Sequence, residues 1–245
     1  MYTPSFNHVS DRAILIEAMQ AYSFAILTGP VDSGPASGQV SSPESATTPG
    51  APSPGASFLS RSLRQGGESS NPSSTTPLTA THLPLVVKDE GPHGLIEGHF
   101  AHANPHWKSL AGRETFVVFP GPHSYVSPTL YTEELSVPTW NYIAVHACGT
   151  LQLVEDDPGK ESILAALMAI HEPAYAARWQ AMHAGFRRTM LAGITGFRIL
   201  IDRIEGKFKI SQNRNETERR NVQAAHAAGT PDQQALAAWM ARLIP

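Results

Sequence analysis

The chain has 245 residues, 41% of them hydrophobic and 16% charged, which is enough apolar material for one substantial core. The formal net charge of −3 provides no broad basic surface, so the composition disfavours nonspecific binding to nucleic-acid phosphates. Cys148 is the single cysteine, which excludes an internal disulfide and a thiolate zinc cluster and is typical of a reducing compartment.

The N-terminal segment predicts an intracellular protein that starts with a short helix. Residues 1–10 lack the basic and apolar regions of a signal peptide, and no later apolar run approaches membrane-spanning length. We therefore expect a cytoplasmic location, with the nucleus as the alternative and no membrane contact. Asp11 is placed to cap a helix whose apolar positions Ile14, Leu15, Ala18 and Met19 share one face.

A long insertion interrupts the next part of the chain. Residues 22–28 have β character, and residues 78–87 alternate as a strand does, with Pro84 requiring an edge position or a bulge. Residues 29–77 between them are rich in Ser, Pro and Gly and bury too little apolar surface to offset the entropy of ordering. We predict a disordered insertion in an early β-hairpin, since the cost of closing a loop grows only slowly with its length.

The rest of the chain mixes short strands with helices. Strands are predicted at residues 95–99, 115–119, 142–148 and 151–155, and helices at residues 157–170 and 175–191. Residues 197–204 and 208–210 resemble a pair of strands that turns at Glu205 and Gly206. Residues 215–245 form a predicted helical tail, with a capping start at Thr230. This order indicates a single α+β domain over residues 1–245 and argues against a doubly wound parallel sheet.

Residues 98–107 contain three histidines, His99, His102 and His106. Imidazoles at such short spacing are candidate ligands for a metal ion or for haem. Gly98 and Pro105 prevent one helix from presenting all three rings, and no nearby carboxylate is placed to support them. The polar lining of a pocket is the favoured interpretation, and we expect no metal site.

Residues 119–128 and 137–142 combine aromatic rings with amide and hydroxyl groups. Rings such as Trp140 and Tyr142 can stack on a planar heterocycle while Asn141 meets its polar edge. Core packing at proline-stiffened turns explains the same residues equally well, so composition leaves both interpretations open.

Residues 206–214 carry a group of hydrogen-bond donors. In a strand, Lys207, Lys209 and Ser211 point to one face, where two ammonium groups and a hydroxyl converge. Further donors follow directly in Gln212, Asn213 and Arg214. An anion, most naturally a phosphate, fits this pattern better than a solvated charged face does.

Six segments spread along the chain form an ordered set of motifs. They are MYTP at residues 1–4, ATHLPL at 80–85, GHFAHANP at 98–105, GPHSYVSP at 121–128, VPTWNY at 137–142 and GKFKISQNR at 206–214. In this order they resemble the PaiB-like family of FMN-binding negative transcriptional regulators. The resemblance implies a split antiparallel β-barrel with flanking helices, similar to pyridoxamine-phosphate oxidase, and a homodimer with flavin at the subunit interface. It also implies that FMN is the cofactor and that its contacts come from Thr81, His82, His99, His102, Asn104, Trp140, Asn141, Tyr142, Lys207, Lys209, Ser211, Gln212 and Asn213.

Two positions depart from the pattern common in that family. His102 stands where Arg is common, and Leu130 stands where Trp is common. An imidazole offers a phosphate no guanidinium fork, and Leu offers no indole for stacking. These departures predict weaker phosphate contact and weaker stacking at the two positions.

Three functions are compatible with the resemblance. The family label favours a regulator that acts through flavin or a related planar ligand; the same label implies DNA binding, which the net charge does not favour. The first alternative is an FMN-dependent oxidoreductase acting on a small molecule, with His82, His99 or Tyr142 as candidate proton donors. The second is a haem-binding or haem-degrading protein. The sequence identifies no catalytic residue for either alternative.

Overall fold

The structure, a computed structural model, describes residues 1–30 and 78–244. The predicted disordered insertion at 29–77 lies outside these residues, apart from Gly29 and Pro30, which prolong a strand instead of starting the insertion. The chain starts with a short 3-10 helix, Ser5–Asn7, and strand β1, His8–Val9. Helix α1, Arg12–Ala21, follows, and the Asp11 carboxylate accepts the backbone N–H of Ala13 at 2.8 Å as the predicted cap.

The predicted hairpin around the insertion is confirmed. Strand β2, Phe24–Pro30, pairs antiparallel with β3, Leu78–Pro84. Strand β3 is an edge strand, as Pro84 requires, because proline cannot donate to a ladder. The strand is interrupted at Leu85, and the chain continues as β4, Val86–Lys88. The single strand predicted over residues 78–87 is therefore two strands.

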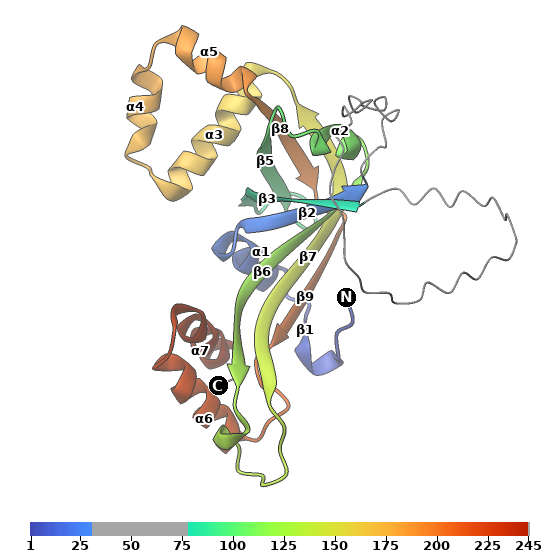
Figure 1. Cartoon of the computed structure of the whole chain (residues 1–245), viewed down its shortest axis with the longest axis vertical. Helices are drawn as coiled ribbons and strands as arrows, with labels where there is room; N and C mark the ends of the chain where they lie inside the picture. The colour runs from blue at the N-terminus through green and yellow to red at the C-terminus, as the bar shows by residue number, and fades with distance from the viewer. Residues whose placement is uncertain (31–77, 245) are drawn as a thin grey trace, which may run out of the picture. The chain divides into compact units, whose positions relative to one another are not determined.

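Two long strands organise the nine-stranded sheet (Figure 1). Strand β6, Glu114–Val126, and strand β7, Thr139–Val154, pair along almost their whole length. The strands predicted at 142–148 and 151–155 are therefore parts of one strand. Strand β5, Leu95–Ala101, extends the far end of the sheet by pairing with β4 and β8.

The predicted strand pair that turns at Glu205 and Gly206 is wrong. Strand β8 is Ile194–Leu200 and strand β9 is Arg203–Lys209, so the chain turns at Ile201 and Asp202. These strands pair with successive stretches of β7, β8 with its end and β9 with its middle. Gly206 lies inside β9, at a point where a Cβ would overlap Cδ2 of Leu15 in α1, so the glycine makes room for the helix and does not mark a turn.

The other helices lie in the connections between strands and in the C-terminal tail. Short α2, His106–Leu110, follows β5, and η2, Pro128–Leu130, follows β6. Helices α3, Asp157–His171, α4, Tyr175–Ala181, and α5, Ala184–Ala192, lie between β7 and β8. The prediction of a single helix at 175–191 is wrong, because the helix is interrupted at Met182. His183 then caps α5, and its Nδ1 accepts the N–H of Gly185 at 3.1 Å. The C-terminal tail contains α6, Glu216–Ala227, and α7, Pro231–Leu243, which starts with the predicted capping box at Thr230.

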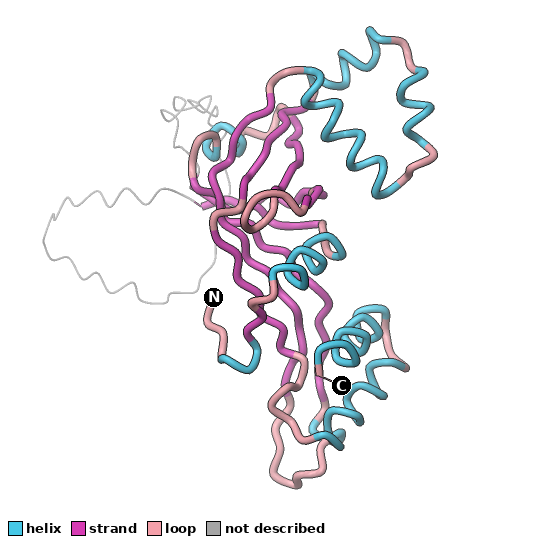
Figure 2. Tube along the Cα trace, turned by 180° about the vertical axis from the view of Figure 1, so that it is seen from behind, coloured by secondary structure: helices cyan, strands magenta, loops and turns pink. Residues whose placement is uncertain are grey.

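The core lies on one face of the long strands. Alternate residues of β7, such as Ile143 and Val145, are buried there with Phe208 of β9. Leu236, Trp239 and Met240 of α7 join this core, so the apolar stripe of the tail packs on its own domain. Figures 1 and 2 show α6 and α7 side by side near the free end of the β6–β7 hairpin. Among the residues that the structure describes, no helix combines the length and apolar character needed to cross a bilayer.

Candidate functional site

Strand alternation divides the predicted site residues between the two faces of β7. Asn141 is fully buried on the core side, whereas Trp140 points outward and is 51% exposed. Tyr142 shares the outward side with Trp140, and Lys207 and Lys209 of the neighbouring β9 also alternate with buried residues. The register places Tyr142 beside Lys209 and Ala144 beside Lys207.

The outward side of the β6–β7 hairpin carries what we call the aromatic face, His123, Tyr125, Trp140 and Tyr142. The Trp140 ring lies 5.6 Å from the His123 ring and 6.4 Å from the Tyr125 ring, between centroids. The Lys207 ammonium lies 5.3 Å from the Tyr142 ring centroid. An open, apolar pocket of about 390 Å³ is lined here by Val118, Pro120, Gly121, His123, Trp140, Tyr142, Ile143 and Ala144.

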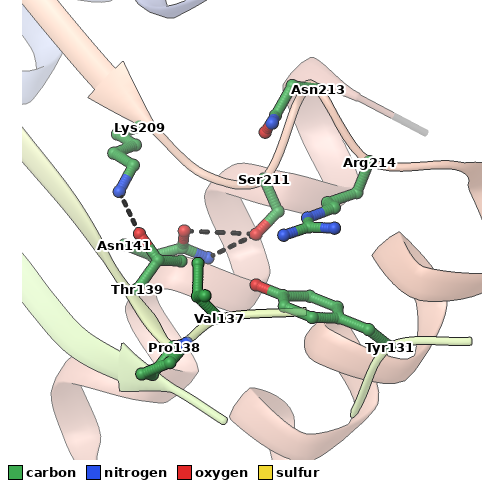
Figure 3. Close-up of a pocket in the computed structure, with 9 residues that line it drawn as sticks. All are labelled: Tyr131, Val137, Pro138, Thr139, Asn141, Lys209, Ser211, Asn213 and Arg214. Atoms are coloured by element: carbon green, nitrogen blue, oxygen red, sulfur yellow. Dashed lines mark hydrogen bonds between the residues drawn. The ribbon is translucent and has the colours of Figure 1, made fainter. Parts of the chain in front are cut away.

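A second, polar pocket of about 120 Å³ lies where β7 begins and β9 ends (Figure 3). It is lined by Tyr131, Val137, Pro138, Thr139, Asn141, Lys209, Ser211, Asn213 and Arg214. Asn141 and Ser211 exchange hydrogen bonds at 3.0 and 3.2 Å, and both are buried. The Lys209 ammonium donates to Oγ1 of Thr139. This polar pocket brings together Asn141, Lys209, Ser211 and Asn213 from the predicted set.

Backbone geometry turns the chain into the polar pocket just after β9. Ser211 has φ 69°, in the left-handed region that a residue with a side chain seldom adopts. The Gln212 side chain accepts the N–H of Ile210 at 2.8 Å and donates to the carbonyl of Phe208, which fastens this turn. Gln212 therefore supports the turn and is not among the residues that line the polar pocket.

Two residues outside the predicted contact set complete the polar pocket. The Arg214 guanidinium stacks on the Tyr131 ring, with 3.8 Å between Cζ and the ring centroid. The Tyr131 hydroxyl is buried and has no hydrogen-bond partner among the described residues. Figure 3 shows this hydroxyl and the guanidinium directed toward Ser211. A buried hydroxyl without a partner is costly, so a ligand acceptor at this point would stabilise the site.

The electrostatics of the polar pocket suit an anion. Burial, with a smaller contribution from Lys207, lowers the pKa of the Lys209 ammonium. Two carboxylates partly neutralise the positive charge of Arg214, since its Nη1 lies 3.7 Å from Glu218 and 4.0 Å from Glu133. A bound phosphate would offset the desolvation of Lys209 and accept from the Tyr131 hydroxyl as well.

The upstream predicted residues form a separate cluster. Thr81 Oγ1 lies 2.9 Å from Nδ1 of His106 and accepts from Nδ2 of Asn104 at 3.3 Å. The sheet register aligns Thr81, through Leu27 and Val117, with Ala147 of β7. Ala147 is six residues along β7 from the polar pocket, which corresponds to about 20 Å. This Thr81 cluster ties β3 to α2 and is not part of the polar pocket.

The remaining histidines are also dispersed. His102 Nδ1 lies 2.9 Å from Oγ1 of Thr195, and its ring lies 5.5 Å from the Trp107 ring. His82 stacks near Phe24 on the outward side of the β2–β3 hairpin. Burial lowers the pKa of His99, whose Nδ1 has no partner in the described part of the chain. Within residues 1–30 and 78–244, no three His, Cys, Asp or Glu side chains gather as a metal-binding group.

The two departures from the family pattern fall in different places. His102 belongs to the upstream region, away from the polar pocket. Leu130 directly precedes Tyr131 and packs against the core, while its carbonyl accepts from Asn221 at 3.0 Å. Of the two, only Leu130 is therefore adjacent in sequence to a residue that lines the polar pocket.

Comparisons with known proteins place the chain among flavin proteins. The family model described as "Putative FMN-binding domain" matches residues 68–203. The chain is 39% identical over 145 residues to "Protease synthase and sporulation protein PAI 2" of Bacillus subtilis, covering 58% of this chain and 70% of that protein. It is 30% identical over 184 residues to an uncharacterized protein of Emericella nidulans, covering 59% of this chain and 73% of that protein.

Solved structures share the fold. The FAD and haem binding protein from Mycobacterium smegmatis matches with a TM-score of 0.54 and 14% identity, over 91% of this chain and 81% of that one. A conserved hypothetical protein from Mycobacterium tuberculosis matches with a TM-score of 0.50 and 10% identity, over 87% of this chain and 92% of that one. At these identities the likeness shows the fold alone, and it confirms the predicted α+β split barrel.

Proposed function

This chain belongs to the family of FMN-binding split-barrel proteins that includes PAI 2 of Bacillus subtilis, and from that membership we propose that it binds FMN at the polar pocket and the aromatic face. Lys209 connects the two, because it lines the polar pocket and is paired with Tyr142 of the aromatic face. The phosphate occupies the polar pocket, between Lys209 and Arg214. The flavin ring lies on the aromatic face, against Trp140 and Tyr142. Of the predicted contacts, this arrangement keeps those at the β7 and β9 ends and leaves the Thr81 cluster a structural role.

The buried hydroxyl of Tyr131 is the observation that carries this proposal. It has no partner among the described residues, and it lies in a pocket bordered by two cations and the Ser211 hydroxyl. A phosphate ester supplies acceptor oxygens for the Tyr131 hydroxyl and for the two cations. When bound, FMN supplies hydride or electron transfer chemistry. The residues of this chain hold the phosphate, orient the ring and place Lys207 near it.

Comparing FMN with riboflavin tests the assignment, because the two ligands differ by the phosphate. Tyr131→Phe removes one hydroxyl and keeps the ring that stacks on Arg214. We expect it to weaken FMN by roughly tenfold and to leave riboflavin unchanged, as for the loss of one charge-assisted hydrogen bond. Tyr175→Phe in α4 is the matched control and should change neither affinity. Equal FMN affinity in Tyr131→Phe and wild type would overturn the assignment of the phosphate.

We also propose that two copies pair through the outward side of the sheet, with flavin between them. The sheet exposes Trp140, Tyr125 and Phe24 there at 51%, 50% and 60%, an arrangement typical of interfaces. Light scattering of the wild type should give the mass of a dimer. Trp140→Lys should shift it toward the monomer, and a monomeric wild type would contradict this part of the proposal.

We infer a regulatory role for the flavin site, in a cytoplasmic setting that the single Cys148 supports. The support is the name of the bacterial relative, "Protease synthase and sporulation protein PAI 2", and a net charge of −3 favours a protein or small-molecule partner over DNA. Steady oxidation of NADH or NADPH by the FMN-loaded protein would move the conclusion to an oxidoreductase. A Soret band on adding haemin that is lost in His99→Ala would move it to haem binding.

A further inference from the structure

Glu218 is a buried carboxylate in the first turn of α6, only 1% exposed. The helix is capped by Asn215, whose Oδ1 accepts the N–H of Glu218 at 2.9 Å. A glutamate at this position commonly reaches back to the capping residue's own N–H. Glu218 instead reaches across to the loop between β6 and β7. A buried carboxylate needs such partners, because an unpaired one is costly.

Three hydrogen bonds join Glu218 to that loop. Its Oε1 accepts from the N–H of Thr132 at 2.9 Å, from Oγ1 of Thr132 at 3.1 Å and from the N–H of Glu133 at 3.4 Å. Asn215 and Asn221 add bonds to Thr132 Oγ1 and to the Leu130 carbonyl, at 3.3 and 3.0 Å. The start of α6 therefore holds the segment that contains Tyr131.

The other carboxylate oxygen lies near Arg214, which lines the polar pocket. Oε2 lies 3.7 Å from Nη1 of Arg214, whose guanidinium stacks on Tyr131. One side chain thus contacts both Arg214 and the residue next to Tyr131. We infer that Glu218 is a positioning residue for the polar pocket: it sets the spacing between the Tyr131 hydroxyl and Arg214 that a phosphate requires. This inference rests on the proposed binding of FMN.

The negative charge itself does not explain the role. A carboxylate beside Arg214 reduces the attraction of the pocket for phosphate. Burial raises the pKa of Glu218, but the hydrogen bonds from Thr132 and Glu133 and the charge of Arg214 lower it overall, so the group is ionised at neutral pH. What Glu218 contributes to binding is its reach to the loop.

Two substitutions distinguish the effect of the length of the Glu218 side chain from the effect of its charge. Glu218→Asp keeps the charge but withdraws the carboxylate by one methylene, which breaks the bonds to the loop. Glu218→Gln keeps an acceptor oxygen at full reach and removes the charge. Flavin fluorescence titrations give the affinities for FMN and riboflavin, and Glu216→Gln is the matched control, an exposed residue of the same helix paired with Arg220.

We expect Glu218→Asp to lose roughly tenfold in FMN affinity with no change for riboflavin, and Glu218→Gln to lose less. The control should behave as wild type. Parallel loss of both ligands, unchanged FMN binding in Glu218→Asp, or a larger loss in Glu218→Gln would each overturn the inference.

A second variant protects the test against misfolding. Thr132→Val removes the hydroxyl that donates to Glu218 at an exposed position, and it should also weaken FMN selectively. If Glu218→Asp does not fold, unchanged FMN affinity in Thr132→Val overturns the inference. A folded wild type that binds neither FMN nor riboflavin would instead refute the proposed function, and the inference with it.

Discussion

Glu97 of β5 supports a sharp prediction about stability. This carboxylate is fully buried between Nζ of Lys88, 2.8 Å from Oε2, and Nε of Arg198, 2.6 Å from Oε1. It joins three strands, because Glu97 is paired with Val86 of β4 and with Arg198 of β8. Arg198→Met keeps most of the apolar stem and leaves Oε1 without its cation.

The contacts of Glu97 set the expected loss of stability in Arg198→Met. A hydrogen bond to a charged group contributes about 1.5–3 kcal/mol, and Lys88 remains as a second partner, so we expect a loss of about 2 kcal/mol in unfolding free energy. Arg220→Met removes an exposed ion pair with Glu216 and should cost less than about 0.5 kcal/mol. Urea unfolding of the three proteins measures both changes. Equal losses in the two variants would refute the reasoning.

The same three residues, Lys88, Glu97 and Arg198, predict that the stability depends on pH. Burial raises the pKa of Glu97, but the bonds and charges of Lys88 and Arg198 outweigh it and lower the pKa overall. A group with a lowered folded-state pKa stabilises the fold above its unfolded pKa, and that stabilisation is lost as pH falls. The difference between wild type and Arg198→Met should therefore be full near neutral pH and shrink below about pH 4. A difference that grows on acidification would contradict this.

Other predictions concern strand β9, helix α7 and the polar pocket. Gly206→Ala should lower stability by about 1–3 kcal/mol in thermal melts, because the new Cβ would overlap Leu15. Thr230→Ala removes the capping box of α7 and should cost about 1 kcal/mol in the same assay, with no loss disproving the cap. Lys209→Met should weaken FMN and spare riboflavin. Burial lowers the pKa of Lys209, so this side chain loses its charge at a lower pH than an exposed lysine does. The FMN affinity of the wild type should therefore begin to fall at that lower pH.

Local signals predicted the elements that local chemistry determines. The Asp11 and Thr230 caps begin their helices as expected, and the change in composition at residues 29–77 located the hairpin of β2 and β3. Long-range packing decided the rest. Gly206 reads as a turn in isolation but makes room for α1, and β8 and β9 pair with β7 and not with each other.

The site shows the same division. The alternation of Lys207, Lys209 and Ser211 predicted a converging group of donors, and the structure brings Lys209 and Ser211 together with Asn141. Tyr131 could not be found this way, because it reaches the pocket from the β6–β7 loop, which α6, far from Tyr131 in the sequence, contacts through Glu218 and Thr132. Thr81 and Asn104 belong to a shared motif, yet their polar groups bond to each other and to the α2 residue His106.

Titration of the purified wild type with FMN and with riboflavin tests the central claim most directly. A phosphate held by Lys209, Arg214 and the Tyr131 hydroxyl should make FMN bind at least about tenfold more tightly than riboflavin. The flavin bands should also shift as the ring meets Trp140 and Tyr142. Equal affinity for the two ligands, or no binding of FMN, would contradict the account.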